Sequence, residues 1–334
     1  MTAASRTATV SRDRTLGIVA DWVRRNGWTL GLFGLLALLF AFTRAIQPTY
    51  GAAGIQGLAN SVLPLAFAAV AQAIVVISGG IDLSIGSMMA LVSVVAAALM
   101  QGQSEEFAVV VVFGALLLGL AIGAINGAVV VVTRVPDIVV TLAMSFVWAG
   151  CALLVLKTDG GAAATWLKEL VRGPIGSEWI PRAAVVLIVV VAAIWIPIRR
   201  SRLGLSIYAV GSSPLAAFRS GVSVPRTKLI AYILAGLFAA LGGLALTANF
   251  GVGKPLPGGQ TLLSVAAVVL GGVSLAGGRG GVVGPIVAVV ILALLQSDMT
   301  LLGLNPNIAT VLQGAILIAV VMLGNVTQIR RGHR

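Results

Sequence analysis

The stretch VVISGGIDLSIGSMM, residues 75–89, places one carboxylate, three serines and a double glycine in an apolar surrounding. A carboxylate inside a membrane segment is costly to desolvate, so it marks either a contact with substrate or ion or a structural role. Aspartate is also a common N-cap, because its side chain accepts hydrogen bonds from the free N–H groups at a helix start. We expect Asp82 to cap a helix near the inner face of the membrane, with direct contact to substrate or ion as the alternative.

A second stretch repeats this pattern. Gly79-Gly80-Ile81-Asp82-Leu83, with Gly86 after it, corresponds to Gly271-Gly272-Val273-Ser274-Leu275, with Gly278 after it. Glycine lets the chain turn sharply, and paired helix interruptions in two halves of a transporter often mark the transport path. We therefore predict that a helix ends at each double glycine and that Asp82 or Ser274 starts the next element. The two breaks are six predicted spans apart, which implies a parallel relation between them.

Several other kinds of chemistry are disfavoured by the residues present. Cys151 is the only cysteine and His333 the only histidine, so thiolate metal clusters and histidine-based catalysis are excluded. The glycine-rich run LAGGRGGVVG, residues 275–284, lacks the Gly-Lys-Ser/Thr ending of a phosphate-binding loop. We expect no cofactor and no metal, and a membrane-embedded enzyme is the least favoured class.

The composition predicts how such residues must be positioned. The chain has 334 residues, of which 59% are hydrophobic and only 10% charged, with a mean hydropathy of +1.07. A soluble domain carries about 25% charged residues, and a membrane-spanning helix needs about 20 apolar residues. We predict an all-α, polytopic integral membrane protein with about ten transmembrane helices and glycine-rich helix breaks. The predicted spans are 28–44, 58–78, 83–101, 107–132, 138–156, 183–198, 228–249, 261–275, 282–297 and 308–324.

The charges orient these spans. With both termini in the cytoplasm, the inner segments hold 16 basic and 4 acidic residues and the outer segments 6 of each, so the whole net charge of +12 lies inside. Lys and Arg collect in cytoplasmic loops, so the basic character indicates orientation and not nucleic-acid binding. The expected organisation is a cytoplasmic tail at 1–27, a transmembrane permease domain at 28–324 with a basic cytoplasmic loop at 199–228, and a tail at 325–334. The outer segment near Trp166–Val171 could hold a short surface helix.

Glycines and polar residues within the spans suggest how the helices pack. Gly119, Gly123 and Gly127 form a bare stripe on one predicted helix, which allows a neighbouring helix to approach closely. Asn126 lies beside the stripe, and its amide must face protein or a water-filled path. The residues predicted to line a path or form a break, each with a plain structural hydrogen bond or cap as the alternative, are Gln72, Ser78, Gly79, Gly80, Asp82, Ser84, Asn126, Thr141, Gly271, Gly272, Ser274, Gln296 and Gln313.

Four ordered stretches resemble the membrane subunit of sugar-type ABC importers, the ribose, xylose, galactose and inositol permease family. They are SGGIDLSIGSMMAL, GAINGAVVVVTRVPDIVVTLAMSFVWAG, RSRLGLSIYAVGSSPLAAFRSGV and AAVVLGGVSLAGGRGGVVG. The resemblance implies a non-enzymatic subunit in the inner membrane of a prokaryote. It also implies its partners: two cytoplasmic ATPase subunits, a second permease that is identical or paralogous, an extracytoplasmic solute-binding protein and a sugar substrate.

The inner loop contains a segment suited to the contact with the ATPase. Residues 214–221 can form a short helix, with Pro214 at its start and Gly221 as its stop. By family likeness this is the coupling helix, formed by Pro214, Ala216, Ala217, Phe218, Arg219 and Gly221. The alternative is a basic surface loop held near anionic lipid.

The predicted function is the permease subunit of an ATP-driven importer that works by alternating access. An ion-coupled secondary transporter without an ATPase is the alternative, and the scarcity of buried acids argues against it. One departure from the family concerns Thr261 and Leu263, which stand where some members carry acids. This absence casts doubt on the best-known sugar specificity and is compatible with pairing to a different permease.

Overall fold

The computed structural model describes residues 27–315 except 257, 306, 309–310, 312–313. A first helix, Gly27–Ile46, precedes the labelled elements. These are α2 (Ala52–Ile77), α3 (Ile85–Met100), α4 (Glu105–Thr133), α5 (Asp137–Val155), α6 (Thr165–Val171), β1 (Pro174–Ile175), β2 (Ser177–Pro181), α7 (Arg182–Arg200), α8 (Arg202–Ser212), α9 (Pro214–Arg219), α10 (Val224–Phe250), α11 (Gln260–Leu270) and α12 (Val283–Leu301).

The protein is a helical, multi-pass membrane protein. Seven of the described helices are long and apolar enough to cross a bilayer, and α3 and α11 are shorter apolar helices. These nine helices coincide with the first nine predicted spans, which confirms the polytopic helical class. The tenth predicted span, 308–324, lies largely outside the described residues, so the count of ten stays a prediction.

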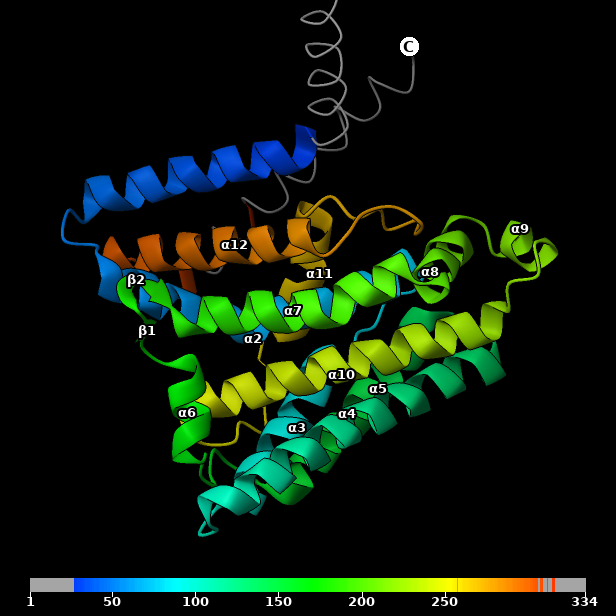
Figure 1. The fold of residues 1–334 in the computed structure, drawn as a ribbon, viewed down its shortest axis with the longest axis horizontal. Coiled ribbons are helices and arrows are strands. Elements are labelled where there is room, and N and C mark those ends of the chain that lie inside the picture. Colours follow the sequence, from blue (N-terminus) through cyan, green and yellow to red (C-terminus); the bar gives the residue numbers. More distant parts are fainter. Residues whose placement is uncertain (1–26, 257, 306, 309–310, 312–313, 316–334) are drawn as a thin grey trace, which may run out of the picture.

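The long helices run side by side between two ends of the molecule (Figure 1). At one end, here called the α9 end, lie α8, α9 and the chain segments that follow α2 and α11. At the other, the α6 end, lie α6 and the hairpin of β1 and β2. Contacts between loops and the ends of distant helices hold this order: Ala162 N donates to Ala97 O at the α6 end, and Gly278 N donates to Ile77 O at the α9 end. Successive spans therefore alternate in direction, as predicted.

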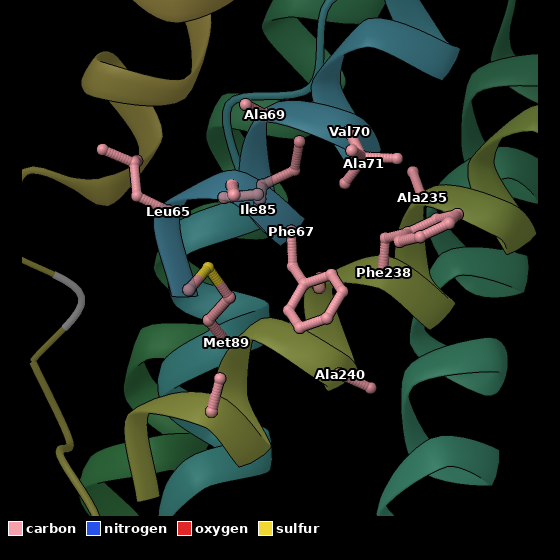
Figure 2. Packing of buried hydrophobic residues seen from close by; sticks show 14 of the residues in the cluster. Leu65, Phe67, Ala69, Val70, Ala71, Ile85, Met89, Ala235, Phe238 and Ala240 are labelled. Carbon is pink, nitrogen blue, oxygen red and sulfur yellow. The ribbon is translucent and has the colours of Figure 1, made fainter. Parts of the chain in front are cut away.

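The centre of the bundle is α2. Its residues from Val62 to Ile77 are all buried, because α7, α10, α11 and α12 pack around it. Phe67 of α2 packs against Phe238 of α10 with ring centroids 6.4 Å apart, and in Figure 2 Met89 of α3 lies on the other side of Phe67. α3 is almost wholly enclosed by protein, so its shortness exposes little backbone to lipid.

The glycine stripe of α4 meets α10. A Cβ at Gly119 or at Gly123 would overlap the backbone of α10 at Gly236 or Tyr232, and Gly127 lies against Tyr232 and Leu229. The stripe thus allows two long helices to approach with their backbones in contact, which confirms the packing prediction.

Secondary structure at the α6 end departs slightly from an all-α fold. β1 and β2 form a short antiparallel hairpin, and α6 is the predicted surface helix. Neither lies within a spanning segment, so the departure does not alter the membrane-spanning architecture.

The first helix is attached to the bundle at both ends. Trp28 Nε1 donates to Leu270 O (2.9 Å), and the indole covers Gly272. Near its other end, Thr43 Oγ1 donates to the buried carboxylate of Asp298 (2.7 Å). The helix is therefore fixed against α11 and α12 although most of its surface is exposed.

Candidate functional site at two helix breaks

The first break follows α2. The helix ends at Ile77, and Gly79 takes a left-handed conformation (φ 84°). Gly80 N donates to Val75 O (3.0 Å) and Gly79 N to Val76 O (2.9 Å). These two bonds form a Schellman motif, which ends a helix and satisfies its last carbonyl groups.

The second break follows α11 with the same geometry. The helix ends at Leu270, and Gly272 has a φ of 79°. Val273 N donates to Val268 O (3.1 Å) and Gly272 N to Val269 O (3.0 Å). The same two bonds at equivalent positions confirm that the repeated sequence is a repeated structure.

The predicted helix starts after the breaks are wrong. α3 begins at Ile85 with Ser84 as its N-cap, and Asp82 lies two residues before that cap. Asp82 Oδ1 accepts from Ser84 N (2.8 Å) and Ser84 Oγ (2.6 Å), so it closes an Asx turn ahead of the helix. Ser274 starts no helix, because α12 begins only at Val283; its amide instead donates to Arg279 O (3.1 Å). Asp82 and Ser274 thus shape the loops after the breaks.

Asp82 is the end of a buried hydrogen-bond chain. Trp148 Nε1 donates to Asn126 Oδ1 (3.0 Å), and Asn126 Nδ2 donates to Ser84 Oγ (2.8 Å), which in turn donates to Asp82. The side chains of Asp82, Ser84 and Asn126 are fully buried. The Oδ2 atom of Asp82 is buried without a partner among the described residues. This chain connects α3, α4 and α5 and leaves one carboxylate oxygen available to a ligand or proton.

Two more predicted residues hold the backbone around Asp82. In the orientation that satisfies its hydrogen bonds, the Gln72 amide donates to Asp82 O (2.8 Å) and accepts from Asp82 N (3.3 Å). Thr141 Oγ1 accepts from Leu83 N (3.0 Å) and lies 2.8 Å from Asp137 O. Residues of α2 and α5 therefore fix the segment between α2 and α3.

Thr261 of α11 takes part in the first break. Its Oγ1 accepts from Gly86 N (3.0 Å), the second residue of α3. This hydroxyl satisfies one of the free N–H groups that Asp82 was expected to cap. α11, which ends at the second break, therefore stabilises the start of α3, which follows the first break.

A charged cluster lies beside the first break. Lys228 Nζ is 3.1 Å from Asp137 Oδ2, and Tyr232 Oη donates to the same oxygen (3.1 Å). Asp137 lies so close to Gly80 that a Cβ there would overlap its carboxylate. The start of α5, the first break and the first turns of α10 are thereby held together.

The two breaks also contact each other. Gly278 N donates to Ile77 O (2.9 Å), which joins the loop after α11 to the last residue of α2. Gly211, near the carboxyl end of α8, packs against this bond, and a Cβ there would overlap Ile77 O. α8 thus meets both breaks at one point.

The surface helix α9 follows α8 after a single residue. Ser213 Oγ accepts from Ala216 N (3.3 Å), and Pro214 occupies the first turn, as its fixed φ favours. The helix ends in a further Schellman motif at Gly221 (φ 82°), with Val222 N donating to Ala217 O (3.0 Å). The predicted short helix is confirmed.

Positive charge is concentrated around this helix. Among the described residues, the α9 end carries eight basic and two acidic side chains, whereas the α6 end carries six of each. The basic residues of the α9 end are Arg134, Arg199, Arg200, Arg202, Arg219, Arg226, Lys228 and Arg279. The charge asymmetry predicted from the sequence therefore agrees with the alternating spans.

Comparison with known proteins shows what kind of protein carries this arrangement. Residues 54–321 match the family model described as the permease component of branched-chain amino acid transport systems. The chain belongs to this permease family. The ribose import permease protein RbsC of Escherichia coli K12 is 33% identical over 317 residues, covering 91% of this chain and 96% of that protein. The autoinducer 2 import system permease protein LsrD of Escherichia coli is 29% identical over 309 residues, covering 89% and 92%. No solved structure is significantly similar.

These similarities confirm the prediction made from the four motifs, a permease of the sugar-type ABC importer family. The permease is a membrane transport component. Its relatives match almost end to end, so both helix breaks and the surface helix fall within the shared region.

The remaining predicted residues of the permease do not lie together at the breaks. Ser78 Oγ donates to Val75 O (2.7 Å) and so stabilises the carboxyl end of α2. Gln296 is exposed on α12, and Gln313 lies outside the described residues. In α9, Ala217 is buried, whereas Phe218 is 67% exposed and Arg219 is exposed as well.

Sequence reasoning missed Gly211 and Tyr208, and it did not foresee that the Gly277-Gly278 pair contacts the first break. Gly211 stands beside two serines and a proline, a pattern that indicates only a turn. Its contact with the breaks depends on how α8 folds back onto the bundle, which no local pattern in the chain encodes. For Tyr208, the one available signal was an aromatic hydroxyl in an otherwise basic loop.

Proposed function

We propose that this permease is the membrane-spanning subunit of an ATP-driven importer, which carries a sugar or sugar-like solute into the cytoplasm by alternating access. The observation that carries the proposal is α9, a separate short helix at the end of the bundle with excess positive charge. Leu215 and Phe218 are 61% and 67% exposed there, beside Arg219. Exposed apolar side chains rimmed by charge are typical of a protein-binding surface.

The partners follow from this assignment. We propose that Pro214, Ala216, Ala217, Phe218, Arg219 and Gly221 form or shape the contact with a cytoplasmic ATPase subunit, and that a second permease, identical or paralogous, completes the path. A solute-binding protein would deliver the solute at the α6 end. The positive-inside rule supports a cytoplasmic α9 end, and a tenth span at 308–324 would return the C-terminus to that side. The site of action would be the inner membrane of a prokaryote.

The solute class is supported by the relatives, whose names state ribose import and autoinducer 2 import. The path itself is proposed to run beside the two helix breaks, where irregular backbone is tolerated because it is enclosed by protein.

One observation favours a second candidate, an ion-coupled transporter. The buried Asp82 keeps one carboxylate oxygen without a partner in the part of the chain that the structure describes, which is the arrangement that a proton or cation site needs. In this case the chain would transport without an ATPase, and Asp82→Asn would abolish that transport.

Reconstitution tests the proposal. The permease is purified in mild detergent with the ATPase and solute-binding proteins that co-purify, and it is placed in proteoliposomes with and without them. Uptake of radiolabelled ribose, then of a panel of pentoses and hexoses, is followed with and without ATP. We expect uptake only with the complete complex and ATP. Uptake by the permease alone would contradict the proposal and favour the ion-coupled alternative.

A further inference from the structure

α8 lies between the surface helix and the two breaks. Ser213 alone separates it from α9: its amide donates to Ala209 O (3.1 Å) at the end of α8, and its hydroxyl accepts from Ala216 N in α9. A displacement of α9 therefore reaches the carboxyl end of α8 through one residue. That residue is hydrogen-bonded to both helices, so little of the displacement can be absorbed between them.

Gly211 is the point where α8 meets the breaks. A Cβ at this position would come within 2.6 Å of Gly278 N and would overlap Ile77 O. A Cβ at Gly79 would lie 3.5 Å from Gly211 Cα, and one at Gly277 would lie 2.7 Å from Gly211 O. Main chain packs directly on main chain here. Packed interiors transmit displacement because they leave no free volume to take it up.

Tyr208 provides a second attachment of the same helix. Its hydroxyl donates to Gly280 O (2.9 Å), in the loop between α11 and α12. A tyrosine is protonated at neutral pH, and burial raises the pKa of Tyr208 further above its ordinary value, so the phenol is able to donate. α8 is thus tied to the second break at Gly280 and to the junction of both breaks at Gly278.

We propose that Gly211 and Tyr208 are positioning residues through which α8 transmits the movement of α9 to both helix breaks together. The inference rests on the proposed function, because it assumes that an ATPase moves α9. The bond from Gly278 to Ile77 joins the breaks, so a force applied by α8 at this point moves the ends of α2 and α11 as one unit. The loops that carry Asp82 and Ser274 then change position in the same step.

The test measures the number of solute molecules taken up per ATP hydrolysed, because a merely structural defect lowers both rates without changing their ratio. The complete complex is reconstituted with Tyr208→Phe or Gly211→Ala in the permease, and uptake of radiolabelled ribose, or of the panel sugar that the wild type transports best, is compared with ATP hydrolysis. We expect the ratio to fall about fivefold for Tyr208→Phe, the change in population that one ordinary hydrogen bond produces. Gly211→Ala should lower it further.

Each variant has a matched control far from α8. Tyr50→Phe removes a hydroxyl that donates to Gly54 O (3.0 Å) at the α6 end, which is the same kind of bond. Gly243→Ala places a Cβ within 2.5 Å of Met89 O between α10 and α3, which is also an overlap with main chain, although a smaller one than at Gly211. Both controls should keep the wild-type ratio.

The outcomes separate the two proposals. If the wild-type complex couples uptake to ATP and Tyr208→Phe keeps the wild-type ratio, the role of α8 is wrong while the proposed function stands. The same conclusion follows if Tyr50→Phe lowers the ratio as much as Tyr208→Phe does. If Gly211→Ala does not fold, Tyr208→Phe decides alone. Absence of ATP-dependent uptake by the wild-type complex would instead overturn the proposed function, and the inference with it.

Discussion

The amide of Gly278 donates to the carbonyl oxygen of Ile77 over 2.9 Å, and this bond joins two helix breaks that are far apart in the sequence. Ile77 is the last residue of α2, so its carbonyl has no partner within its own helix. An unsatisfied carbonyl away from water costs several kcal/mol. The loop of the second break therefore satisfies the carbonyl group at the end of the first, and neither break can move freely without the other.

The end of α9 offers a direct test of coupling. Gly221 has a φ of 82° and open space around the position of a Cβ, so the strain of a substitution there comes from the backbone alone. Gly221→Val should cost roughly 1–2 kcal/mol locally and displace the end of α9. We expect a protein that inserts normally, with ATP hydrolysis retained and uptake strongly reduced, measured in proteoliposomes with the complete complex.

Gly102→Val is the matched control for this variant. Gly102 also has a positive φ (71°) and open space, but it lies at the α6 end. It should keep the wild-type ratio of uptake to hydrolysis. Normal transport by Gly221→Val would show that α9 is not the coupling helix.

The contact between α4 and α10 predicts opposite effects of the same substitution at two sites in one helix. Gly123→Ala adds a methyl group that overlaps Tyr232 O, whereas Gly114→Ala adds one in open space. Helix propensity favours alanine over glycine by about 1 kcal/mol. We expect Gly114→Ala to raise or keep the unfolding temperature in detergent, and Gly123→Ala to lower it by several degrees. Equal effects would mean that the two helices are not in backbone contact.

The sequence was sufficient to predict the elements whose signals are local. Apolar length placed nine spans, and Pro214 with Gly221 bounded α9, because composition and turn chemistry act over a few residues. The double glycines correctly marked both breaks. The sequence was insufficient where several residues could make the same hydrogen bond and the tertiary fold decides which of them does. Asp82 could cap α3, but Thr261 from α11 supplies that acceptor instead, and this depends on tertiary packing.

The buried chain from Trp148 to Asp82 makes Asn126 a stability residue. Asn126→Leu leaves Trp148 Nε1 without its acceptor and Ser84 Oγ without one of its donors. An unsatisfied buried donor costs about 1–3 kcal/mol, so we expect a clear loss of stability in thermal unfolding followed by intrinsic fluorescence and by aggregation in detergent. Trp148→Phe, in the same chain of hydrogen bonds, removes the donor that Asn126→Leu leaves without an acceptor.

The double variant is therefore the informative control. Asn126→Leu with Trp148→Phe should be less destabilised than the sum of the two single changes, because the two side chains share one bond. Additive losses would show that the bond does not form, and that Asn126 instead faces water or solute, as a path-lining residue would.

The orientation of the bundle can be measured with single cysteines, because Cys151 is the only native one. In a Cys151→Ala background, Ser220→Cys places an exposed thiol next to α9, and Ser177→Cys places one in β2 at the α6 end. The excess of basic residues at the α9 end predicts that this end is cytoplasmic. In intact spheroplasts, a membrane-impermeant maleimide should therefore label Ser177→Cys and spare Ser220→Cys, and lysis should expose both. Labelling of Ser220→Cys in intact spheroplasts would place α9 outside, where no ATPase could reach it.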